Sequence, residues 1–105
     1  MAIQKKVARK LETAKAAVRN LKLMSPIPQE KDLRAGGAAL FQYVPYAVEL
    51  SITYYRVSDT IGRFEVYSAR NGKTQIFTFI TLEKYVQAFR DAKTYALKEL
   101  ELMKE

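Results

Sequence analysis

The 105-residue sequence contains no cysteine, no histidine and no tryptophan. A chain without cysteine has no disulfide bond, no thiol nucleophile and no cysteine-ligated zinc. A chain without histidine lacks the residue used most often as a general base and as a ligand for transition metals. These absences remove several large classes of enzyme and metalloprotein. We therefore expect a protein that is not an enzyme and that uses no cofactor and no metal.

Long apolar runs are also absent. The longest stretch without a charged residue, 35–48, is interrupted by glycine, glutamine and proline, whereas a membrane-spanning helix needs about 20 mostly apolar residues. The N-terminus leads into charged residues rather than into the apolar segment of a secretory signal. The sequence therefore predicts a cytoplasmic protein with no membrane partner.

Motifs for catalysis are lacking as well. Residues 72–74 (Gly-Lys-Thr) end like a phosphate-binding P-loop, but Tyr67 stands where that motif requires glycine. The Asn71-Gly72 pair is instead typical of the turn in a β-hairpin. We expect a hairpin at this position rather than a nucleotide site.

Acidic residues are scarce in the first part of the chain. The protein has 18 basic and 11 acidic residues, a net charge of +7, and residues 1–24 hold seven of the basic residues but only one acidic residue, Glu12. Concentrated positive charge attracts polyanions and raises the rate at which they bind. Nucleic acid is therefore the first candidate partner, ahead of an anionic membrane surface or an acidic protein.

The length and the 49% share of apolar residues fit a single domain, 1–105, with its own core. Residues 1–24 are predicted to form a basic amphipathic helix, because apolar residues recur every three or four positions from Ile3 to Leu21. Two prolines end this helix, and residues 25–37 are predicted to form a linker.

The apolar period changes to two in residues 38–80, which predicts three or four antiparallel strands. Thr81 is the expected N-cap of a long C-terminal helix within 81–105. The predicted fold class is therefore α+β, with an antiparallel sheet preceded and followed by an amphipathic helix.

The aromatic residues, seven tyrosines and five phenylalanines, follow the alternation of the predicted strands. With Leu50, Phe64 and Ile76 taken as core residues, one face of the sheet gathers six rings. These are Phe41, Tyr43, Tyr55, Tyr67, Phe77 and Phe79. The face is open if both helices lie on the other side, and it is a second core face if each helix covers one side.

Residues of two kinds are predicted to bind nucleic acid. Basic side chains would contact phosphate groups, and aromatic rings would stack on bases at about 1–3 kcal/mol each with little sequence specificity. The predicted phosphate contacts are Lys5, Lys6, Arg9, Lys10, Arg34, Arg63, Arg70 and Lys73. The predicted stacking residues are Tyr43, Tyr55, Tyr67, Phe77 and Phe79. Single-stranded DNA or RNA is therefore preferred over duplex.

Two other functions stay open. The sheet face could bind duplex DNA, or the protein could be a homodimer with a structural role and no nucleic-acid function. A dimer could form through the aromatic face or through a seam of residues spaced by seven on the last helix. The residues of that seam are Leu82, Phe89, Ala96 and Met103. An exposed aromatic face favours nucleic acid, and a covered one favours assembly.

The order of strand, turn, strand and helix over residues 47–97 is similar to that of known DNA-binding domains. Residues 62–67 (Gly-Arg-Phe-Glu-Val-Tyr) are followed by the turn at 71–73 and by a helix that begins within 81–85 (Thr-Leu-Glu-Lys-Tyr). This layout resembles the plant ethylene-response-type DNA-binding domain and the phage integrase arm-binding domain. The resemblance implies a three-stranded sheet laid into the duplex major groove. The chain lacks the tryptophan-containing strands common in the plant family, and it adds a basic helix in front. In architecture alone it is also similar to archaeal single-stranded-DNA-binding proteins that end in a long helix.

Overall fold

The computed structural model of the chain describes residues 2–23, 37–44, 48–56 and 61–103, with side chains from Lys10 onward in the first helix and from residue 39 onward in the first strand. Within these residues no helix is long and apolar enough to cross a membrane. The elements in chain order are α1 (Ala2–Arg19), β1 (Gly37–Tyr43), β2 (Leu50–Arg56), β3 (Gly62–Ser68), β4 (Lys73–Phe79) and α2 (Leu82–Leu102). The predicted α+β class is confirmed, and the antiparallel sheet, predicted to have three or four strands, has four.

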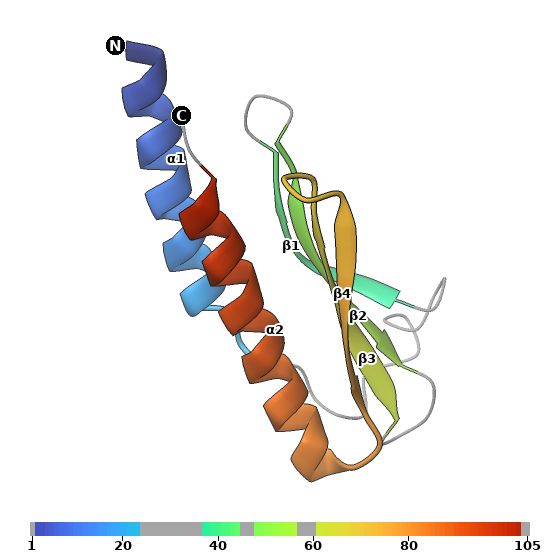
Figure 1. Cartoon of the computed structure of the whole chain (residues 1–105). Helices are drawn as coiled ribbons and strands as arrows, with labels where there is room; N and C mark the ends of the chain where they lie inside the picture. Colours follow the sequence, from blue (N-terminus) through green and yellow to red (C-terminus); the bar gives the residue numbers. More distant parts are fainter. Residues whose placement is uncertain (1, 24–36, 45–47, 57–60, 104–105) are drawn as a thin grey trace.

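The strands lie in the order β1-β2-β3-β4, so β1 and β4 form the two edges of the sheet. Both helices lie on the same side of this sheet, as Figure 1 shows. We call the side toward the helices the covered face and the other side the open face. Because neither described helix lies on the open face, the alternative of one helix on each side of the sheet is wrong.

The core lies between the covered face and α2. It is dominated by aromatic rings whose centres lie 4.9–6.3 Å from their neighbours, the spacing at which aromatic pairs add to the gain from burial. The members of this aromatic cluster are Tyr54, Phe64, Phe79, Tyr85 and Phe89. Leu50, Ile52 and Val66 are also fully buried on the covered face. The cluster therefore joins β2, β3, β4 and α2 in one contact.

α1 packs on α2 and runs antiparallel to it (Figure 1). The buried apolar residues described in α1 are Leu11, Ala14 and Val18, which agrees with the predicted apolar stripe. At the end of α1 the Lys93 ammonium donates to the carbonyl oxygens of Arg19, at 2.8 Å, and Leu21, at 3.2 Å. A cation at this position satisfies the last carbonyl groups of a helix. α1 ends at Arg19 rather than at the predicted residue 24.

α2 begins where the sequence predicted. The hydroxyl of Thr81 accepts a hydrogen bond of 3.1 Å from the backbone N–H of Lys84, as an N-cap does. Phe89, Ala96 and Met103 are buried in the chain's own core. Three of the four residues of the predicted dimer seam therefore pack inside one chain and cannot contact a second helix. Of the four, Leu82 alone is exposed.

The predicted orientation of β4 is wrong. Phe64 pairs with Phe77 and Gly62 pairs with Phe79, and paired residues of an antiparallel sheet share a face. Both phenylalanines therefore belong to the covered face, and Ile76, predicted to be inward, is half exposed on the open face. The cause is the even number of residues in the turn 69–72, which pairs even-numbered residues of β3 with odd-numbered residues of β4.

The predicted orientation of β1 is wrong for a different reason. The register of β1 against β2 shifts between Ala39 and Phe41, so a bulge reverses the alternation. Phe41 pairs with Ile52 and Tyr43 pairs with Leu50. Phe41 and Tyr43 therefore lie on the covered face rather than on the open one.

Replacing a ring of the aromatic cluster should unfold the protein far more readily than replacing a ring of the open face. We expect Tyr54→Ala to lower the free energy of unfolding by about 3–5 kcal/mol, because it leaves a cavity in a packed core. Tyr55→Ala, on the next residue but the opposite face, should cost about 1 kcal/mol or less. Chemical denaturation of both variants measures the difference, and equal losses would contradict a one-sided core.

Candidate nucleic-acid interface

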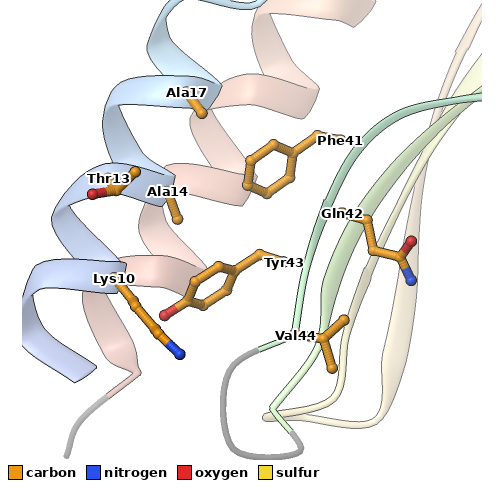
Figure 2. Close-up of a pocket in the computed structure, with 8 residues that line it drawn as sticks. All are labelled: Lys10, Thr13, Ala14, Ala17, Phe41, Gln42, Tyr43 and Val44. Atoms are coloured by element: carbon orange, nitrogen blue, oxygen red, sulfur yellow. The ribbon is translucent and has the colours of Figure 1, made fainter. Parts of the chain in front are cut away.

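A groove lies between α1 and the edge strand β1 (Figure 2). Its volume is about 470 Å³, within the range of pockets that hold small organic ligands. We call it the α1–β1 groove. It is lined by Lys10, Thr13, Ala14 and Ala17 from α1 and by Phe41, Gln42, Tyr43 and Val44 from β1 and its end.

The groove exists because small side chains on α1 face large ones on β1. Ala14 and Ala17 end at Cβ, whereas Figure 2 shows the rings of Phe41 and Tyr43 pointing toward α1. Both rings are half-buried, since alanine does not cover them fully. Each ring therefore keeps surface on which a flat, apolar group can pack.

Positive charge and aromatic surface meet in the α1–β1 groove. Lys10 is exposed and reaches the same space as Tyr43 (Figure 2). Both were predicted to bind nucleic acid, Lys10 through phosphate and Tyr43 through stacking. The structure brings these two side chains together. Tyr43, however, lies on the covered face of the sheet and not on the open face, where it was predicted.

The other basic residues of α1 differ in their surroundings. Lys15 is buried and bonds to Glu12, at 3.2 Å, and Glu101, at 3.0 Å; the hydrogen bond to Glu101 raises the pKa of Lys15. Arg19, the last residue of the helix, and Lys22, just after it, are exposed. The side chains of Lys5, Lys6 and Arg9, and all of Arg34, lie outside the described residues.

A second groove lies on the other flank of α1, between the end of that helix and α2, with a volume of about 550 Å³. Its basic residues are Arg19, Arg90 and Lys93, and none of the described residues that line it is acidic. Arg90 and Lys93 were not predicted as site residues, because charge balance along a helix does not reveal which charges share one of its sides. The remaining lining is mostly apolar and includes Leu23, Val86, Phe89 and Leu97.

The open face carries fewer rings and less usable charge than predicted. Tyr55 and Tyr67 lie on it as expected, both half-buried. Arg63 also lies there, but its guanidinium group is 4.4 Å from the centre of the Tyr55 ring, and its Nε donates to Glu65 at 2.6 Å. The charge of Arg63 is therefore matched by a carboxylate on the same face.

The two predicted stacking residues of β4 pack against other rings of the protein. Phe79 is buried in the aromatic cluster, and the ring of Phe77 lies 6.0 Å from that of Tyr95 on α2. Phe79 therefore has no surface left for a base, whereas Phe77 is half-buried and packs one side of its ring against Tyr95. Lys73, at the start of β4, is exposed.

Arg70, predicted to contact phosphate, binds a buried carboxylate instead. Its Nε and Nη2 donate to the two oxygens of Glu99 at 3.1 and 2.9 Å, and Asn71 donates to Glu99 at 3.3 Å and to the Tyr95 hydroxyl at 3.1 Å. The hydrogen bonds from Arg70 hold the pKa of Glu99 below its ordinary value. This cluster fastens the β3–β4 turn to α2, and nothing in the spacing of residues 70 and 99 indicated it.

Comparison with known proteins gives no match to a family model, to a curated protein or to a solved structure.

Acid should weaken the fold through Glu99. Because the folded-state pKa of Glu99 lies below its ordinary value of 4.5, this group contributes stability above pH 4.5 that is lost as the pH falls through the folded pKa. We expect Glu99→Gln to lower the urea midpoint at pH 7, where the charge is needed, and to flatten the loss of stability below pH 4.5. Urea unfolding at several pH values measures both. An unchanged midpoint at pH 7 would show that the cluster does not hold the turn.

Proposed function

We propose that this protein binds single-stranded DNA or RNA in the α1–β1 groove, with little sequence specificity and without catalysing a reaction. The observation that carries the proposal is the meeting of Lys10 with the partly covered rings of Phe41 and Tyr43 in one groove. A cytoplasmic location is part of the proposal.

Stacking on the two rings supplies the contact with bases. Every base has an apolar face, so stacking on phenylalanine or tyrosine does not select a sequence. Phe41 and Tyr43 are separated by one residue on the same face of β1, about 7 Å apart along a strand. Neighbouring nucleotides of an unpaired strand, whose backbone is flexible, could therefore place one base on each ring.

The charge of α1 supplies the contact with phosphates. Residues 1–24 hold seven basic residues and one acidic residue. The helix also lies between two grooves that each contain a basic residue from α1, Lys10 in one and Arg19 in the other. A strand with bases in the α1–β1 groove would keep its phosphates close to this helix, where displaced counterions favour binding.

A duplex fits the molecule less well. Its bases are stacked inside the helix, so they cannot enter the α1–β1 groove to reach Phe41 or Tyr43. A duplex would instead have to lie on the open face, where the charge of Arg63 is matched by Glu65. The basic helix α1 lies on the opposite side of the sheet (Figure 1) and could not assist.

Removing a ring from the groove should weaken binding, while removing a ring from the open face should not. We expect Phe41→Ala and Tyr43→Ala each to lose about 1–3 kcal/mol of binding, or roughly 5- to 150-fold in affinity, because each removes a stacking platform. Tyr67→Ala, a half-buried tyrosine of the open face, is the matched control and should bind like the parent protein. Fluorescence anisotropy with labelled single-stranded DNA and RNA measures the affinities.

The same titrations at two salt concentrations separate the two kinds of contact. Charge-neutralising Lys5, Lys6, Arg9 and Lys10 to glutamine should flatten the dependence of log affinity on log salt by about 0.7 per lost phosphate contact, whereas Tyr43→Ala should leave that slope unchanged. If Tyr55→Ala and Tyr67→Ala lose affinity while both groove variants keep it, the open face binds the nucleic acid and the proposed site is wrong. Circular dichroism of each variant shows that it is folded.

A further inference from the structure

The two edges of the sheet are not equivalent. The register of β1 against its neighbour is broken by the bulge between Ala39 and Phe41. The register of β4 against β3 is unbroken over seven residues, from Lys73 to Phe79. Most of β4 is exposed, including four consecutive residues from Lys73 to Ile76. β4 therefore presents a regular, accessible row of backbone groups at the edge of the sheet.

Nothing in the sequence of β4 protects this edge. Natural edge strands are usually blunted by a proline, a bulge, or charged side chains. Residues 73–79 (Lys-Thr-Gln-Ile-Phe-Thr-Phe) have no proline and no acidic residue, and their one basic residue stands at the start. The strand is also rich in β-branched and aromatic residues, which favour pairing.

Exposed apolar side chains gather at the same place. Seven large hydrophobic residues are exposed in the described part of the chain, and four of them lie on β4 or beside its end. Exposed apolar patches of this kind usually mark a site of protein contact. The four residues and their exposed fractions are Ile61 40%, Ile76 50%, Ile80 70% and Leu82 50%.

We propose that β4 pairs antiparallel with β4 of a second copy of this chain, around a two-fold axis at Ile76. Ile76 is the middle residue of the strand, so this register pairs all seven residues. Ile76 then faces Ile76 of the second copy, and Thr74 faces Thr78, both favourable cross-strand pairs. The contact is isologous and closes at two chains.

A second copy fits this edge because the strand can pair with itself without placing like charges opposite one another. Two molecules of net charge +7 repel each other, so the contact must add no further repulsion of its own. In the register around Ile76 the one charged residue of β4, Lys73, faces Phe79 of the other copy at each end of the pair. The edge can therefore form hydrogen bonds with a second copy over all seven residues, with no pair of like charges facing each other.

The dimer leaves the proposed nucleic-acid site free. Paired residues share a face, so both helix layers lie on one side of an eight-stranded sheet. The two α1–β1 grooves then lie at the outer edges, as far as possible from the contact. The dimer consequently does not depend on the proposed function, and either can fail alone.

A single cysteine tests the pairing directly, because the chain has none of its own. Antiparallel partners have Cα atoms about 4.5–5.5 Å apart, inside the range of about 4.4–6.8 Å that a disulfide spans. Mild oxidation of Ile76→Cys should therefore convert most of the protein to a covalent dimer. Val44→Cys, equally exposed but beside the opposite edge strand, is the matched control and should stay mostly monomeric.

The molecular mass in solution is the second test of the dimer. Sedimentation of the parent protein at submillimolar concentration should give twice the 12.0 kDa of one chain. Ile76→Lys and Ile76→Glu should each be monomeric, because they place like charges opposite one another, and an equimolar mixture of the two should restore the dimer. The proposal would be overturned if the parent protein were monomeric, or if Ile76→Cys and Val44→Cys crosslinked equally. The edge would then be available to pair with a strand of another protein. A dimer that survives Ile76→Lys would place the contact elsewhere.

Discussion

The packing of one aromatic cluster against one face of the sheet is the constraint on which the rest of the structure depends. Tyr54, Phe64 and Phe79 project from three neighbouring strands toward Tyr85 and Phe89 of α2. Because these rings all lie on the covered face, α2 is fixed there as well. α1 packs on α2, so its position follows, and the groove between α1 and β1 follows from both. The function that we propose is thus a consequence of where five rings are buried.

Because both helices cover the same face of the sheet, the basic residues of α1 are separated from the rings of the open face. The sequence had suggested that these two groups would bind nucleic acid together. The basic helix α1 lies on the helix side of the molecule (Figure 1). Tyr55 and Tyr67 lie on the open face, on the other side of the sheet. One short strand of nucleic acid cannot lie on both faces. The combination of charge and rings occurs instead at the edge of the sheet, where Lys10 and Tyr43 line a common groove.

The element order, the antiparallel sheet, the N-cap at Thr81 and the orientations of Tyr54 and Tyr55 could be predicted from the sequence, because each depends on local periodicity or on a single side chain. The orientations of Phe77 and Phe79 also follow from register, because an even-numbered turn at 69–72 places them opposite inward residues of β3. The apolar character of Ile76 points to the opposite orientation, and register overrides it.

The orientation of β1 could not be predicted from the sequence, because no residue type near Leu40 is a signal for the bulge. The bond between Arg70 and Glu99 joins residues far apart in the sequence, so it appears only when the turn meets α2. The α1–β1 groove depends on both kinds of information, because it needs the small residues Ala14 and Ala17 opposite a strand of reversed orientation.

The most direct test of the central claim is a nuclear magnetic resonance titration of the isotope-labelled protein with a short, unlabelled single-stranded oligonucleotide. Shifts of the backbone amides locate the contact without any substitution. We predict that the largest changes fall on residues 10–17 and 41–44, on the two walls of the α1–β1 groove, while Tyr55, Arg63 and Tyr67 change little. Changes concentrated on those three residues, or no change at saturating oligonucleotide, would contradict the account.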